Sequence, residues 1–307
     1  MAMLGSRRST VTAAAFGSSR VHNGFDPRVF DAALADSGYT VDSLNLALFG
    51  GSQTEQRALA RDFSAHLVRP DGRPSVCMVL LEINAGLNFQ ATNLFHPRSI
   101  NLYDPDTVVF AMRFSGESLG TRRRLGRAAI AISAGVLHFA NVGMLGEALF
   151  DPIADTLSPK RTGEALRGFL NEDPTAAGLA GVRRAFEDRP RQAATQEVPI
   201  LPGNRQLLAD IASVAAVSNL QLMYFVTPSL DDLALAPVYP AVIDGPNGPI
   251  PIFNFAQTSR YPQLFDEKLW RDPGHLSTTG ATALTRLLAE EVRAWLAQTP
   301  NASRCGN

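Results

Sequence analysis

Short apolar segments rich in strand-forming residues alternate along this chain with segments of helical periodicity. Five segments have the strand pattern, at residues 10–16, 44–49, 75–83, 221–226 and 251–255. Strands that alternate with crossover helices are typical of a parallel sheet. The third segment has apolar residues on both faces, as expected for a central strand of a parallel sheet. The sequence therefore predicts an α/β fold built on a five-stranded parallel sheet.

The alternation is interrupted between about residues 86 and 203. Within this stretch, residues 88–106 have the composition of a loop. Residues 121–150, 164–170 and 176–187 have helical patterns, and nothing repeats the pattern of the sheet. We therefore expect one domain, residues 1–307, with a helical insertion or cap at about 86–203. Residues 128–150 are apolar over roughly the length of a membrane span, but they contain His138 and Glu147, which are costly at a bilayer centre. A buried helix or helix pair is expected there, with no integral membrane span.

Composition excludes one class of partner. The chain has a formal net charge of −1, so no basic excess is present to bind nucleic acid. Residues 1–8 carry charge but no apolar core, so we expect neither a signal peptide nor an N-terminal anchor. At face value this indicates the cytoplasm. An extracytoplasmic protein whose anchor precedes this chain is the alternative, and the compartment and the oligomeric state stay open.

A serine follows the first predicted strand in the turn Gly17-Ser18-Ser19-Arg20. Ligands bind at the carboxyl ends of the strands in open α/β sheets, so Ser19 is placed where a nucleophile would act. A helix N-cap is the alternative role for a serine after glycine. Of the two serines, Ser18 is the better candidate for that cap.

A second motif, Asp272-Pro273-Gly274-His275, precedes the last helical segment. An aspartate three residues before a histidine can orient the imidazole as a general base. The alternative is an exposed loop histidine, with Asp272 as an ordinary turn residue. If the fold joins the two ends of the chain, Ser19, Asp272 and His275 form a Ser-His-Asp site.

An acyl-transfer site also needs hydrogen-bond donors for the negative oxygen of its intermediate. The backbone N–H groups of Ser19 and of Gly50 or Gly51 are candidates, since both turns follow predicted parallel strands. The side-chain amide of Asn84, after the third strand, is another. Ordinary turn geometry is the alternative explanation for these residues.

Motifs for cofactors and metals are absent from the sequence. It contains no HExxH, CxxC, GxGxxG or GxxxxGK[ST] pattern, so we expect no metal, no cofactor and no bound nucleotide.

Together these blocks resemble the SGNH/GDSL hydrolase superfamily. The similarity covers about residues 10–84 and 205–298. It implies a flavodoxin-like three-layer α/β/α sandwich with a five-stranded parallel sheet. It also implies Ser19 as nucleophile, Gly50 and Asn84 in the oxyanion hole, and Asp272 and His275 as the remaining triad residues.

The turn Gly17-Ser18-Ser19-Arg20 is similar to a bacterial SGNH-like branch that includes proteins linked to O-acylation of cell-envelope polymers. That likeness implies a small-molecule or glycan ester as substrate, and an esterase or O-acyltransferase as the activity. Two departures are visible in the sequence. Ser18 stands where the family usually has aspartate, and the third block reads Glu82-Ile83-Asn84-Ala85 instead of Gly-x-Asn-Asp.

Two alternatives remain at this point. One is a catalytically inactive SGNH-like module that binds a glycan or a protein partner. The other is an unrelated doubly wound protein in which the motifs coincide by chance. The second predicts that Ser19 and His275 lie well beyond hydrogen-bonding distance.

Overall fold

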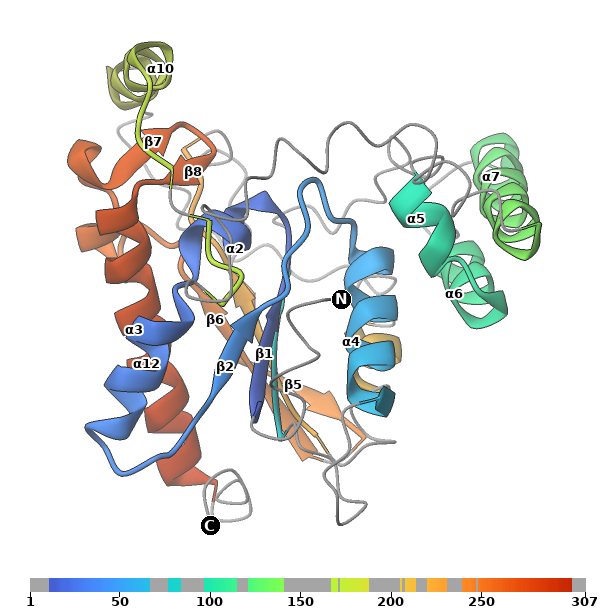
Figure 1. The fold of residues 1–307 in the computed structure, drawn as a ribbon, viewed down its shortest axis with the longest axis horizontal. Helices are drawn as coiled ribbons and strands as arrows, with labels where there is room; N and C mark the ends of the chain where they lie inside the picture. Colours follow the sequence, from blue (N-terminus) through green and yellow to red (C-terminus); the bar gives the residue numbers. More distant parts are fainter. Residues whose placement is uncertain are drawn as a thin grey trace.

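A six-stranded sheet forms the centre of the protein (Figure 1). The computed structural model describes residues 11–66, 77–83, 97–114, 121–140, 167–170, 172–187, 205, 208–213, 220–230, 239–246 and 248–299. The sheet has the strand order β2-β1-β3-β4-β6-β5. Its strands are β1 (Ala13–Phe16), β2 (Ser43–Asn45), β3 (Met78–Glu82), β4 (Gln221–Val226), β5 (Val242–Gly245) and β6 (Gly248–Asn254).

Five of the six strands are parallel, and the sixth makes the predicted strand count wrong. β1 pairs with β2 and β3, β3 pairs with β4, and β4 pairs with β6, all in parallel. The additional strand, β5, runs antiparallel to β6 at the edge of the sheet. It is short and partly exposed, so it lacks the apolar character by which the other strands were predicted. The α/β class and the parallel arrangement are as predicted.

Successive residues of the central strands point to opposite faces of the sheet, as the pleat requires. In β1, Ala13 and Ala15 join the hydrophobic cluster on the face covered by α3 (Pro27–Ala35) and α12 (Thr278–Gln298). Ala14 and Phe16 join the cluster on the opposite face, which includes residues of α4 (Gln53–His66). Helices therefore lie against both faces (Figure 1).

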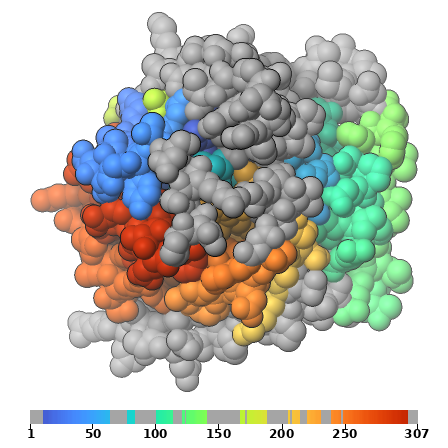
Figure 2. Space-filling view, turned by 90° about the horizontal axis from the view of Figure 1, so that it is seen from below, coloured from blue at the N-terminus to red at the C-terminus, as the bar shows by residue number. Residues whose placement is uncertain are grey.

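Helices from the N-terminal and C-terminal parts of the chain meet on one side of this sheet. Helix α3 begins after the N-cap Asp26 with proline at its first position, and α12 begins after the N-cap Ser277. The two helices pack against each other. In Figure 2 the blue N-terminal segment lies beside the red C-terminal helix, and the green helices lie on the opposite side of the molecule.

The predicted insertion contains helices at two separate places. Helices α5 (Pro97–Leu102), α6 (Pro105–Phe114) and α7 (Thr121–Phe139) pack together beside α4, whereas α10 (Ala176–Glu187) packs against β7 (Trp270–Asp272) (Figure 1). Residues 97–102, which the sequence assigned to a loop, are helical. Residues 167–170, assigned to a helix, form a turn because Arg167 and Gly168 both have positive φ.

Helix α7 covers the first part of the apolar stretch that resembles a membrane span. Residues 141–150, the rest of that stretch, lie outside the described residues. The helix buries Ala131 and Ala134 and leaves Leu125 and Phe139 exposed. Within the described residues, none of the helices combines the length and the apolar character that crossing a bilayer requires.

Candidate active site

Ser19 begins α2 (Ser19–Gly24), directly after the turn that follows β1. Ser18 is the N-cap of that helix, as predicted: its hydroxyl accepts a hydrogen bond from the backbone N–H of Arg20 at 3.2 Å. Because Ser18 takes this role, the hydroxyl of Ser19 is not needed for capping. Ser19 is the first residue of α2 and is half-buried at the carboxyl end of β1.

Asp272 and His275 lie on a small antiparallel hairpin. It consists of β7 and β8 (His275–Leu276), preceded by the short 3-10 helices η3 (Pro262–Leu264) and η4 (Glu267–Leu269). The turn is closed by the Asp272 carboxylate, which accepts a hydrogen bond from the backbone N–H of Gly274 at 3.0 Å. The backbone N–H of Leu230, after β4, donates to the carbonyl of Pro273 and ties the hairpin to the central sheet.

The fold brings these two distant segments into direct contact. The distance from His275 Nε2 to Ser19 Oγ is 2.8 Å, and the distance from His275 Nδ1 to Asp272 Oδ1 is also 2.8 Å. A neutral imidazole that donates from Nδ1 to a carboxylate has an unprotonated Nε2. That nitrogen can then accept the proton of the Ser19 hydroxyl. The three residues have the geometry of a nucleophile, a base and a group that orients the base.

The carboxyl group of Asp272 is held in its charged form. Partial burial by itself raises its pKa, but the hydrogen bond and charge of His275 and those of Arg271 lower it more, to about 2. Arg271 donates from Nε to Asp272 Oδ2 at 3.0 Å, so each carboxylate oxygen has its own partner. Asp272 is therefore an ionised hydrogen-bond acceptor for the imidazole at all ordinary pH values.

The predicted oxyanion donors differ in whether their N–H groups are already hydrogen-bonded within the protein. Within the described part of the chain, no residue accepts a hydrogen bond from the backbone N–H of Ser19. The N–H of Gly51, in contrast, donates to the carbonyl of Leu48 at 3.0 Å, so it serves the turn after β2. Gly50 occupies the left-handed region of that turn, with a φ of 60°. Asn84 lies outside the described residues.

The turn that contains Gly50 lies directly beside the serine turn. The carbonyl of Gly17 accepts a hydrogen bond from the backbone N–H of Leu48 at 2.8 Å. A β-carbon on Gly51 would lie 3.0 Å from the same Gly17 oxygen, so the two turns meet at backbone distance. The turn that contains Gly50 therefore lies next to the turn that carries Ser19.

One residue at the site was not identified as important from the sequence. Glu82, at the end of β3, is completely buried. It accepts hydrogen bonds from the backbone N–H of Ser18 at 2.6 Å and from the hydroxyl of Thr227 at 2.5 Å. A carboxylate at the end of an apolar strand is an unusual signal, since charged residues are rarely buried without partners. Glu82 anchors the turn that carries Ser19.

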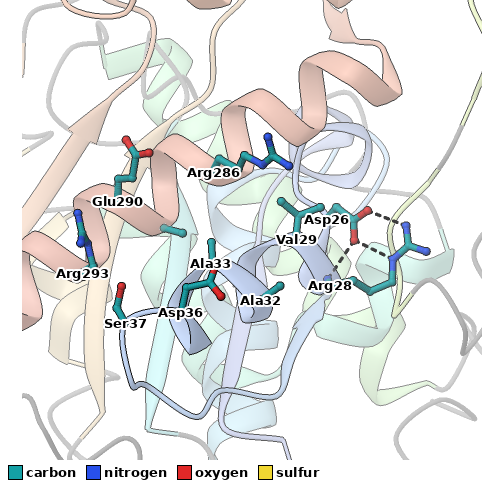
Figure 3. Close-up of a pocket in the computed structure, with 11 residues that line it drawn as sticks. Asp26, Arg28, Val29, Ala32, Ala33, Asp36, Ser37, Arg286, Glu290 and Arg293 are labelled. Carbon is teal, nitrogen blue, oxygen red and sulfur yellow. Dashed lines mark hydrogen bonds and ion pairs between the residues drawn. The ribbon is translucent and has the colours of Figure 1, made fainter.

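A surface hollow is found elsewhere, between α3 and α12 (Figure 3). It has a volume of about 650 Å³ and is lined by small residues such as Ala32 and Ala289 and by charged residues such as Arg286. None of Ser19, Asp272 and His275 lines it. The candidate site is therefore defined by the hydrogen-bonded side chains and not by this hollow.

Metal ligands do not cluster in the described segments: no three His, Cys, Asp or Glu side chains there converge as a metal site would require.

Comparison with known proteins adds no family assignment, because neither a family model nor a curated protein matches the chain.

Proposed function

We propose that this protein is a serine-dependent ester hydrolase or O-acyltransferase of the SGNH/GDSL type. The observation that carries the proposal is the position of the His275 ring, 2.8 Å from both Ser19 Oγ and Asp272 Oδ1. The alternative in which the motifs coincide by chance predicts a wide separation of Ser19 from His275, and this distance argues against it. For the fold, the order β2-β1-β3-β4-β6 of the parallel strands supports a flavodoxin-like three-layer sandwich.

In the first half of the reaction, His275 Nε2 accepts the proton of the Ser19 hydroxyl while Ser19 Oγ attacks the carbonyl carbon of an ester. The tetrahedral intermediate that forms carries a negative oxygen. The backbone N–H of Ser19 is available to stabilise that oxygen, and the family resemblance adds Gly50 and Asn84. The intermediate collapses when the proton on Nε2 passes to the leaving oxygen, which departs as an alcohol and leaves an acyl-Ser19.

The second half reverses these proton transfers. His275 removes a proton from water or from an acceptor hydroxyl, whose oxygen attacks the acyl carbonyl. Ser19 then leaves and regains its proton from Nε2. Water as the acceptor makes the protein an esterase, and a sugar hydroxyl makes it an O-acyltransferase. An acylated carbohydrate is the substrate class that the family resemblance favours.

Turnover of p-nitrophenyl acetate tests this proposal. We expect the wild-type protein to release p-nitrophenol, and we expect Ser19→Ala and His275→Ala to be inactive. Replacing Asp272 with asparagine should lower kcat by about 10⁴-fold, because the amide favours the wrong imidazole tautomer. Absence of turnover in the folded wild-type protein would instead favour the inactive binding module.

A further inference from the structure

Arg271 contacts both of the segments that form the candidate site. Its guanidinium binds Asp272 Oδ2 through Nε and a second nitrogen, each at 3.0 Å. The remaining nitrogen, Nη1, donates to Asn23 Oδ1 on helix α2 at 2.8 Å. The side chain is only 13% exposed, so these contacts are sheltered from water. One guanidinium therefore joins the hairpin that carries His275 to the helix that carries Ser19.

Asn23 completes a closed ring of hydrogen bonds. Its side-chain amide donates from Nδ2 to the backbone carbonyl of Ser19 at 2.8 Å, one helical turn earlier. The ring runs from Ser19 Oγ through the side chains of His275, Asp272, Arg271 and Asn23 and returns to the Ser19 backbone. Each of these bonds limits the freedom of the next one, so the ring restricts the separation of Ser19 from His275.

The insertion supports Arg271 from outside the ring. Glu172 forms an ion pair with Nη1 of Arg271. A few residues later, helix α10 lies against the backbone of the hairpin, since a β-carbon on Gly178 would lie 2.5 Å from the Arg271 carbonyl oxygen. A β-carbon on Gly181 would similarly lie 3.1 Å from the ring of Pro273. The insertion thus packs on the residues next to Asp272.

We propose that Arg271 is a positioning residue, held by Asn23 and Glu172, which sets the geometry of the Ser19-His275-Asp272 site. This inference rests on the proposed function. Arg271 occupies Oδ2 of Asp272, so that Oδ1 faces the imidazole and the carboxylate cannot rotate freely. It also fixes α2 relative to the hairpin. A planar guanidinium can do both because its donors point in several fixed directions, whereas a lysine acts as a single point charge.

Variants of the ring test the inference through kcat and KM for p-nitrophenyl acetate. Arg271→Met should lower kcat by about 100-fold with little change in KM, since misplacement of reacting groups by about 1 Å has an effect of that size. Arg271→Lys should restore part of the loss, and Glu172→Gln should have a smaller effect than Arg271→Met. The matched control is Arg183→Gln on α10, whose exposed ion pair with Glu267 lies outside the ring. Its kcat should equal that of the wild type.

A double mutant separates positioning from general destabilisation. Once Arg271→Met has opened the ring, adding Asn23→Ala should cause little further loss of kcat, whereas independent roles would give losses that multiply. Losses of kcat that multiply, or an unchanged kcat in folded Arg271→Met, would overturn the role of Arg271. The proposed function would still stand if the wild type shows turnover that depends on Ser19. If Arg271→Met does not fold, Asn23→Ala, Arg271→Lys and their double mutant are compared instead. Losses of kcat that multiply in that double mutant would again overturn the role of Arg271. A wild-type protein without Ser19-dependent turnover would overturn both.

Discussion

The buried carboxylate of Glu82 accepts a hydrogen bond from the backbone N–H of Ser18, with 2.6 Å between the two atoms. This bond joins the end of β3 to the turn between β1 and α2. Its two residues, Ser18 and Glu82, are 64 residues apart in the sequence. Because Ser18 is the N-cap of α2, the same bond orients the helix that begins with Ser19. The position of the proposed nucleophile therefore depends on a residue of the neighbouring strand.

Loss of the Glu82 side chain should destabilise the protein. Glu82→Ala removes the acceptor for Ser18 and leaves a cavity, so we expect the free energy of unfolding to fall by about 2–4 kcal/mol. Glu82→Gln should cost only about 1 kcal/mol, because its amide can still accept from Ser18 while donating to the Thr227 hydroxyl. Denaturant unfolding of both variants measures the difference. Equal losses would show that the hydrogen bonds do not matter.

The low pKa of Asp272 predicts a pH dependence of stability. Its pKa is about 2 in the folded protein against an ordinary value of 3.8, so the unfolded chain binds the proton more readily between these values. The free energy of unfolding should therefore rise with pH across this window, and the contribution is lost as the pH falls through about 2. Comparing acid unfolding of the wild type with that of Asp272→Asn isolates the effect. The variant should have the shallower slope.

His22 predicts a second pH dependence, at higher pH. Burial lowers its pKa from 6.5 to about 4, although a hydrogen bond to the backbone of Gly168 raises it in part. The unfolded chain therefore binds more protons between pH 4 and 6.5, and the protein should lose stability as the pH falls through this window. His22→Phe keeps the ring contact with Phe49, whose centroid is 4.7 Å away, and should remove the slope. A pH dependence of stability that persists in His22→Phe would show that another titratable group causes it.

Two glycines in helices should respond oppositely to alanine. Gly126 on α7 has nothing within 4 Å of its β-carbon position, so Gly126→Ala should stabilise the protein by about 0.5–1 kcal/mol. Gly178→Ala would place a methyl group 2.5 Å from the Arg271 carbonyl oxygen and should cost about 1–3 kcal/mol. Thermal unfolding measures both changes. Stabilisation by both substitutions would contradict the close packing of α10 on the hairpin.

The sequence was most informative where a pattern is local. Ser19 after an apolar strand and Asp272 three residues before His275 are short-range signals, and α10 was predicted with its observed boundaries because its periodicity is regular. Strand β5 was missed because it is short and partly exposed, so its residues carry little apolar signal. The turn at Arg167 and Gly168 was missed for a different reason. That turn is stabilised by contact with β2, because the Arg167 carbonyl accepts a hydrogen bond from the backbone N–H of Asn45.

The supporting residues of the site could not be predicted in the same way. Arg271 contacts Asn23, which is 248 residues away in the sequence, and Glu172, which is 99 residues away. Neither pairing follows from a spacing, because both depend on how the insertion and the C-terminal hairpin pack on α2. Glu82 carried a weak signal as a charge at the end of an apolar strand, but its partner Ser18 became apparent only from the fold.

The role of Ser19 as the nucleophile is tested most directly by covalent labelling with an alkyl fluorophosphonate, followed by mass spectrometry to locate the modified residue. Such reagents react with serines that a neighbouring base activates. We expect a single adduct on Ser19, strongly reduced labelling of His275→Ala, and no labelling of Ser19→Ala. Labelling that persists in Ser19→Ala, or a folded wild-type protein that remains unmodified, would show that Ser19 is not an activated nucleophile.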